Sequence, residues 1–292
     1  MVKKQALANA TASWTAKKLG CKPHVPLMRS LQSRLLVEDR AVPDLCLSGM
    51  GIVGAASESP FFEPWLVPAQ LSLNELLAKA PSQRPIICNR VLTSGRAAEP
   101  DLTKAVWKKT QEEIAAGTMS PKMTHEQLTS KYGAFYNIVP SFGLHQGSDD
   151  KGKPKYRRID DHTAGYNNLA AECRLKIPMA MTDYVLIMIK LIEMIFSPTA
   201  WPQDDGSPNC ATEDMKGAYR QLALLAAHVF IAITAVYNPH NDTVELHEMY
   251  GQPFGAGHAV PNFYRLAEWL CRTIGRLFHI VVDHFFDDFF VV

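Results

Sequence analysis

The chain of 292 residues is long enough for one large or two ordinary domains, and its 47% hydrophobic and 20% charged residues are typical of a soluble globular protein. A formal net charge of +1 excludes a protein that attracts nucleic acid over its whole surface, so a nucleic-acid site would have to be a local basic patch. The N-terminus lacks the apolar core of a secretory signal, and the longest apolar stretch, residues 184–196, is too short to span a bilayer. We therefore expect an intracellular protein, cytoplasmic or nuclear, that is neither secreted nor embedded in a membrane.

The six cysteines are scattered, and no two of them form a C-x-x-C pair: Cys21, Cys46, Cys88, Cys173, Cys210 and Cys271. Closely spaced cysteine pairs are the usual signature of structural zinc sites. We predict reduced thiols in structural positions and do not expect zinc.

Residues 1–98 are the least informative part of the chain. Segments rich in Pro, Ser and Gly interrupt every long pattern there. We expect a loosely structured N-terminal region of unknown function, with short strands at 45–53 and 84–92 and a short helix at 72–80.

From residue 101 the patterns become clearer. Apolar residues at helical spacing predict a helix over 101–117 that ends at Gly117, and Thr124 with Gln127 forms the sequence of a capping box at the start of another helix. A largely apolar helix is predicted from Thr182 to about residue 196.

A basic segment lies between these helices, with five cations in eight residues: Lys151, Lys153, Lys155, Arg157 and Arg158. Two interpretations are open. The segment is either a solvated loop or hairpin, or a patch that binds phosphate groups.

The last third of the chain predicts a mixed fold. A short strand ends at Asp214, a turn follows at Gly217, and strands over 228–237 and 243–249 are expected to pair across the turn between them. A helix from about residue 260 precedes an apolar hairpin over 279–292. This order predicts an α+β fold with helices on one face of an antiparallel sheet.

The acidic doublet Asp287–Asp288 lies inside the apolar hairpin, where unpaired charges are costly. A bound cation at the hairpin tip would resolve this cost. The other doublets, at 149–150, 160–161 and 204–205, lie in polar surroundings and predict solvated loops. His279 and His284 flank the hairpin, but we do not expect them to bind Mg²⁺, which prefers oxygen ligands.

Asp214 ends a strand that could neighbour this hairpin, in which case three carboxylates would converge on a pair of divalent cations. Two-metal sites of this kind recur in enzymes that carry out in-line displacement at phosphorus. On the residues alone, unrelated surface acids are the more common explanation of such a pattern, and that interpretation stays open.

The ordered motifs resemble those of retroelement reverse transcriptases, in particular those of protist mobile elements. FGLHQ followed by KYRRIDD resembles the basic fingers segment, and TEDMKGAYRQL resembles polymerase motif A. PFGAGHAVPNFYRL resembles motif B, and FFDDFF resembles motif C. Phe285 departs from the family, which mostly has tyrosine there. The resemblance covers residues from about 101 to the end and none of the first 98.

The resemblance implies a right-hand polymerase, with fingers and an antiparallel palm sheet backed by helices in residues 99–292. It implies two Mg²⁺ ions, for which Mn²⁺ can substitute, held by the catalytic aspartates Asp214, Asp287 and Asp288. The residues that it implies for the nucleotide are Lys155, Arg157, Arg158, Tyr219 and Gln252. Those that it implies next to the template and primer are Pro253, Phe254, Gly255 and Arg265.

The implied partners are a primed RNA or DNA template and a deoxynucleoside triphosphate, with further domains of a longer polyprotein. Because the sequence stops four residues after the doublet, we expect the thumb to be absent. Three alternatives stay open: an inactive fragment that at most binds nucleic acid, an RNA-dependent RNA polymerase, and a phosphohydrolase or nuclease. Tyr219 argues against the second, because RNA polymerases typically have an aspartate there, and no general base supports the third.

Overall fold

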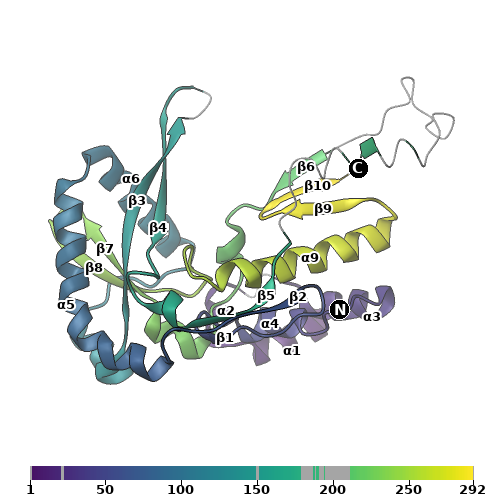
Figure 1. Ribbon diagram of the computed structural model, residues 1–292, viewed down its shortest axis with the longest axis horizontal. Helices are drawn as coiled ribbons and strands as arrows, with labels where there is room; N and C mark the ends of the chain where they lie inside the picture. Colours follow the sequence, from purple (N-terminus) through teal and green to yellow (C-terminus); the bar gives the residue numbers. More distant parts are fainter. Residues whose placement is uncertain are drawn as a thin grey trace.

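The computed structural model describes residues 2–20, 23–148, 151–178, 187, 189–190, 194 and 211–291. Helices alternate along the chain with strands, which form both antiparallel and mixed sheets. This arrangement confirms the predicted α+β class (Figure 1). Two of the predicted doublets, at 149–150 and 204–205, lie outside the described residues. Most of the helix predicted at 182–196 also lies outside them. No helix among the described residues is long and apolar enough to cross a lipid bilayer.

A four-stranded sheet forms one half of the molecule, in the order β4-β3-β7-β8. Its strands are β3 (Ile138–Ser148), β4 (Pro154–Asp160), β7 (Ile233–Asn238) and β8 (Thr243–Glu248). β3 and β4 form a long antiparallel hairpin that rises above the sheet in Figure 1. The predicted pairing of β7 with β8 is confirmed, but β3 runs parallel to β7, so this sheet is mixed and not purely antiparallel.

Two long helices, α5 (Leu73–Ala97) and α6 (Pro100–Ala115), pack against this sheet. Gly95 and Gly143 make the packing close. A β-carbon on Gly95 would lie 2.3 Å from the Tyr237 ring, and one on Gly143 would lie 2.5 Å from Leu102. The predicted helix stop at Gly117 is confirmed by its left-handed backbone, with φ of 74°. The predicted capping box also forms, at the start of α7 (His125–Tyr132).

A three-stranded antiparallel sheet lies in the other half, in the order β6-β10-β9. Its strands are β6 (Ala211–Asp214), β9 (Val282–Phe285) and β10 (Asp288–Val291). The helix predicted from about residue 260 is α9 (Ala259–Phe278), which contacts β9 along its length (Figure 1). The expected single sheet is therefore two separate sheets, because β6 pairs with the C-terminal hairpin and not with β7.

Two of the four N-terminal helices contact α9 on the side away from this small sheet, and the other two pack against those helices (Figure 1). The four helices are α1 (Val2–Thr11), α2 (Trp14–Lys18), α3 (Val25–Leu35) and α4 (Val42–Ser48). Apolar side chains of these helices join residues of α9, and Phe289 of β10, in one buried cluster. The structure thus differs from the expected loosely built region, since these helices supply part of the core on which α9 rests.

The strands expected at 45–53 and 84–92 are wrong. Residues 45–48 belong to α4, and residues 84–92 lie inside α5, which starts at the capping box of Ser72 and Glu75. Pro81 and Pro85 suggested breaks, but the helix continues through both.

The remaining elements connect these layers. A third sheet has the order β1-β5-β2 and is formed by β1 (Gly54–Ala55), β2 (Glu63–Val67) and β5 (Ala171–Lys176). Short 3₁₀ turns are η1 (Gly133–Phe135), η2 (Asn167–Ala170), η4 (Ala218–Gln221) and η5 (Ala226–Ile231).

Candidate active site

The predicted acidic hairpin forms, but only one of its two aspartates lies in the turn. Asp288 pairs with Phe285, which leaves Phe286 and Asp287 as a two-residue turn. Phe286 has a left-handed backbone with φ of 55°, a conformation that is rare for a bulky residue. Asp287 therefore lies at the tip, and Asp288 is the first residue of β10.

Strand β6 brings Asp214 to the same place. Asp214 is the direct partner of Asp288 across the antiparallel pair, and the amide of Met215 donates a 2.9 Å hydrogen bond to the carbonyl of Asp287. Side chains directly opposite in such a pair point to the same face, with β-carbons about 4.5–5.5 Å apart. The carboxylates of Asp214 and Asp288 thus share one face of the sheet, although 73 residues of sequence separate them.

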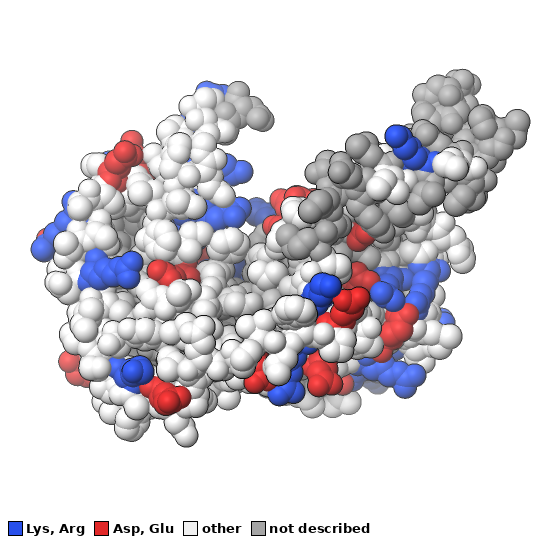
Figure 2. All heavy atoms as spheres, viewed as in Figure 1, with Lys and Arg blue, Asp and Glu red and all other residues white. Residues whose placement is uncertain are grey.

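A cavity of about 810 Å³ lies between the acidic hairpin and the β3–β4 hairpin. In Figure 2 the surface is hollowed between these two parts, and basic side chains lie on the flank of β3–β4. Eight of the predicted site residues line it: Lys155, Arg157, Arg158, Tyr219, Phe254, Gly255, Asp287 and Asp288. The structure therefore places cations and carboxylates on different walls of one cavity.

Tyr219, on η4, forms part of the cavity wall between two other rings. Its ring centroid lies 5.6 Å from that of Phe254 and 5.1 Å from that of Phe263. Burial and the nearby charge of Asp287 raise the pKa of Tyr219 to about 12, so its hydroxyl stays protonated at neutral pH.

Strand β4 contributes the basic wall, and its alternation separates two adjacent arginines. Lys155 and Arg157 are exposed, and the Arg157 guanidinium lies 5.0 Å from the centre of the Phe254 ring. Arg158 points the other way and is buried. Lys155 and Arg157 are therefore the cations of β4 that are placed to meet an anionic ligand.

A buried ion-pair network lies beneath the cavity, and the sequence did not predict it. Arg158 and Arg220 both contact Glu113 and Asp160, with nitrogen–oxygen distances of 2.9–3.2 Å. Burial alone would raise the pKa of Asp160, but the charges of Arg158 and Arg220 outweigh it and lower that pKa far below its usual range. The expected solvated loop at 160–161 is therefore wrong for Asp160, which is fully buried.

This network also holds the turn at 252–257. Arg220 donates to the carbonyl of Gln252, and the Gln252 side chain donates to the carbonyl of Met50 at 2.7 Å. Gly255 has φ of 112°, and a β-carbon there would lie 2.2 Å from the carbonyl oxygen of Asp160. The glycine thus allows the turn to rest directly on the end of β4.

Four predicted site residues do not line the cavity: Asp214, Gln252, Pro253 and Arg265. Gln252 and Pro253 are buried in the turn. Arg265 is buried on α9, where its guanidinium pairs with Asp39 at 2.8 Å and donates to Ser57. The side chains of Gln252 and Arg265 are thus held by partners in the N-terminal region, which the sequence patterns do not indicate.

The donor set of the three aspartates fits a hard cation such as Mg²⁺, because it consists of carboxylate oxygens alone. Two like charges opposite each other on a strand pair are destabilising unless a cation neutralises them. Within the described part of the chain, the three carboxylates do not all lie within 4.8 Å of one another. A two-metal site does not require that spacing, since its ions are about 3.5–4 Å apart.

Comparisons with known proteins assign no family to this chain. No protein-family model matches its sequence, and no curated protein matches it.

Proposed function

We propose that this chain is the fingers and palm of a right-hand polymerase, a retroelement reverse transcriptase that adds deoxynucleotides to a primer on an RNA or DNA template. The observation that supports it best is the pairing of Asp214 with Asp288, next to a cavity that Asp287 and Asp288 line and whose other wall holds Lys155 and Arg157. In this proposal β3–β4 belongs to the fingers, and β6, β9, β10 and α9 form the palm.

Each accessible residue has a defined task. Lys155 and Arg157 bind the triphosphate, because both are exposed cations on the wall that faces the carboxylates. Tyr219 lies beneath the sugar, where its ring leaves no room for a ribose 2′-hydroxyl. Asp214 and Asp287 hold the cations, with Asp288 in support.

Two Mg²⁺ ions, or Mn²⁺ in their place, would activate the primer 3′-hydroxyl and neutralise the departing pyrophosphate. The chain's own contribution is to fix Asp214 and Asp288 opposite each other on adjacent strands, with Asp287 in the turn next to them. The fold also keeps the basic side chains of Lys155 and Arg157 on the opposite side of the cavity from these carboxylates.

In this proposal Arg158, Gln252 and Arg265 are positioning residues. Their side chains are buried and bound to protein partners, so they act through the residues that they hold. Pro253, Phe254 and Gly255 form the turn that would lie next to the templating base.

Primer extension on poly(rA)/oligo(dT) with Mg²⁺ tests the proposal. We expect template-dependent incorporation of dTTP, reduced at least about 100-fold in Asp287→Asn, because that carboxylate would stabilise the charge of the reacting phosphate. Glu213→Gln is the matched control, since it makes the same carboxylate-to-amide change one residue before Asp214, on the opposite face of β6. It should retain activity.

Two results would contradict the proposal: no incorporation by the wild-type chain, or equal incorporation by Asp287→Asn. Salt-sensitive binding of primer–template without incorporation would instead support a fragment that only binds nucleic acid.

A further inference from the structure

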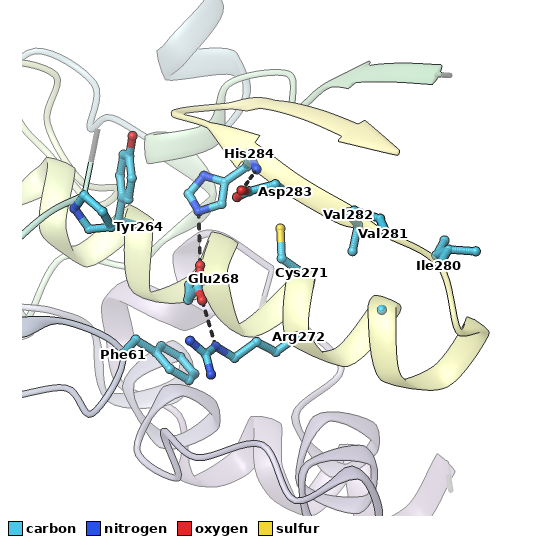
Figure 3. Close-up of a pocket in the computed structure, with 12 residues that line it drawn as sticks. Phe61, Tyr264, Glu268, Cys271, Arg272, Ile280, Val281, Val282, Asp283 and His284 are labelled. Carbon is cyan, nitrogen blue, oxygen red and sulfur yellow. Dashed lines mark hydrogen bonds and ion pairs between the residues drawn. The ribbon is translucent and has the colours of Figure 1, made fainter. Parts of the chain in front are cut away.

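A second group of chemically reactive side chains lies behind the acidic hairpin. Cys271 of α9 faces Asp283 and His284 of β9, and the sulfur, a carboxylate oxygen and a ring nitrogen of the three all lie within 4.8 Å of one another (Figure 3). They line a cavity of about 580 Å³ that also includes Glu268 and Arg272. This cavity is separate from the one described above.

The orientation of His284 is that of a metal ligand. Its Nδ1 lies 3.1 Å from the carbonyl oxygen of Phe286, and because a carbonyl only accepts, Nδ1 carries the proton. The lone pair of a neutral ring is then on Nε2. A backbone carbonyl that fixes the tautomer in this way is the usual second partner of metal-bound histidines.

That lone pair faces Glu268. Nε2 lies 3.9 Å from Oε2 of the carboxylate, which is too far for a hydrogen bond. Two acceptor atoms facing each other across this gap repel, and an ion between them removes the repulsion. Ligand atoms of a tetrahedral zinc are roughly 3.5 Å apart, given bonds of about 2.0–2.3 Å. The separation of 3.9 Å between Nε2 of His284 and Oε2 of Glu268 would therefore have to shorten only slightly.

The charges around the cavity favour a cation. Asp283 and Glu268 are acidic, and Arg272 is already paired with Oε1 of Glu268 at 2.7 Å and with Glu38 at 3.1 Å. Burial raises the pKa of the Cys271 thiol, so binding of a divalent cation there would release the thiol proton.

We propose that Cys271, Asp283 and His284 bind one zinc ion, with Oε2 of Glu268 as the fourth ligand. A thiolate and an imidazole select zinc or a related transition metal and not Mg²⁺, so this site is chemically distinct from the three aspartates. The ion ties β9 to α9 and thereby braces the strand that leads to Asp287. The proposal stands whether or not the chain is a polymerase.

Cobalt substitution tests it directly. The chelator-treated full chain is titrated with Zn²⁺ by calorimetry and with Co²⁺ by absorption spectroscopy, where a thiolate–cobalt charge-transfer band reports the cysteine. We expect one ion per chain, the cobalt band, and a dissociation constant raised at least about tenfold by Cys271→Ser or Asp283→Asn. Cys88→Ser, which removes a half-buried thiol from another cavity, should bind as the wild type does.

Asp287→Asn separates this site from the candidate active site, because it should retain the cobalt band while losing primer extension. If Cys271→Ser does not fold, Asp283→Asn provides the comparison, since Asp283 is only half-buried. The absence of a thiolate–cobalt band in the wild type, or equal zinc affinity in Asp283→Asn, would overturn the proposal.

Discussion

In the proposed function, the ring of Tyr219 selects deoxynucleotides over ribonucleotides. It packs between Phe254 and Phe263 and faces the cavity that contains Asp287. Tyr219→Ala should therefore increase ribonucleotide incorporation relative to deoxynucleotide at least about tenfold, a difference of about 1.4 kcal/mol in transition-state binding. Competing dTTP and UTP in primer extension measures this ratio.

Tyr219→Phe is the matched control. It keeps the ring and removes only the hydroxyl, so sugar preference should stay that of the wild type if the bulk of the ring excludes the 2′-hydroxyl. A Tyr219→Ala variant with unchanged preference would refute the assignment of this residue.

Single residues of the site differ in how far the sequence could predict them. The doublet at 287–288 was identified because charges inside an apolar run need a reason. Arg157 and Arg158 could not be told apart, because alternation along a strand shows that adjacent side chains diverge but not which one faces the core. Asp160 was misjudged, since its buried partners Arg158 and Arg220 come together only in the fold.

The turn at 252–257 is the element that joins the two halves of the candidate site. Gly255→Ala should lower the free energy of unfolding by at least about 2 kcal/mol, because its φ of 112° disfavours a side chain and the new β-carbon would overlap the Asp160 carbonyl at 2.2 Å. Urea denaturation followed by circular dichroism measures the change.

Gly217→Ala is the control for backbone strain alone. Gly217 also has a left-handed backbone, with φ of 64°, but no atom lies within 4 Å of the added carbon. Its cost should be about 1 kcal/mol. Equal destabilisation by the two substitutions would show that contact with Asp160 does not matter.

Elements with strong local signals were predicted well. The helices at α6, α7 and α9 and the hairpin of β7 with β8 follow from periodicity, caps and turns within the segments themselves. The helix predicted at 72–80 is the start of α5, but its continuation was missed because proline costs about 3 kcal/mol inside a helix. The compensation comes from packing against β3 and β7, which local sequence does not show. The split into two sheets likewise depends on contacts between distant segments.

At the scale of the whole molecule, the N-terminal region and the candidate palm form one packed unit. Helix α9 lies between the β6-β10-β9 sheet and the N-terminal helices. Arg265 of α9 pairs with Asp39, which belongs to the N-terminal region. Residues of the N-terminal region thus contact the face of α9 opposite β9, the strand that leads to the acidic turn.

Buried histidines make the stability of the molecule depend on pH. His162 is buried, and its Nδ1 lies 2.9 Å from the amide nitrogen of Asn167. That nitrogen also donates to the carbonyl of Ile231, while the amide oxygen accepts from Asn137, so the network fixes Nδ1 as an acceptor. Only a neutral ring satisfies this arrangement, and burial lowers the pKa of His162 to about 4.

The unfolded chain therefore binds a proton at His162 from about pH 6.5 downward, whereas the folded chain does so only near pH 4. The free energy of unfolding should fall as pH decreases through this window, by about 3 kcal/mol from His162 alone, and His228 should add to the loss because burial also lowers its pKa to about 4. Urea denaturation between pH 7.5 and 4 measures the slope.

His162→Gln should be less stable at pH 7 but should show a shallower decline of the unfolding free energy with falling pH. His145→Gln, on the exposed end of β3, is the control and should keep the wild-type slope. An unchanged slope in His162→Gln would contradict the assignment.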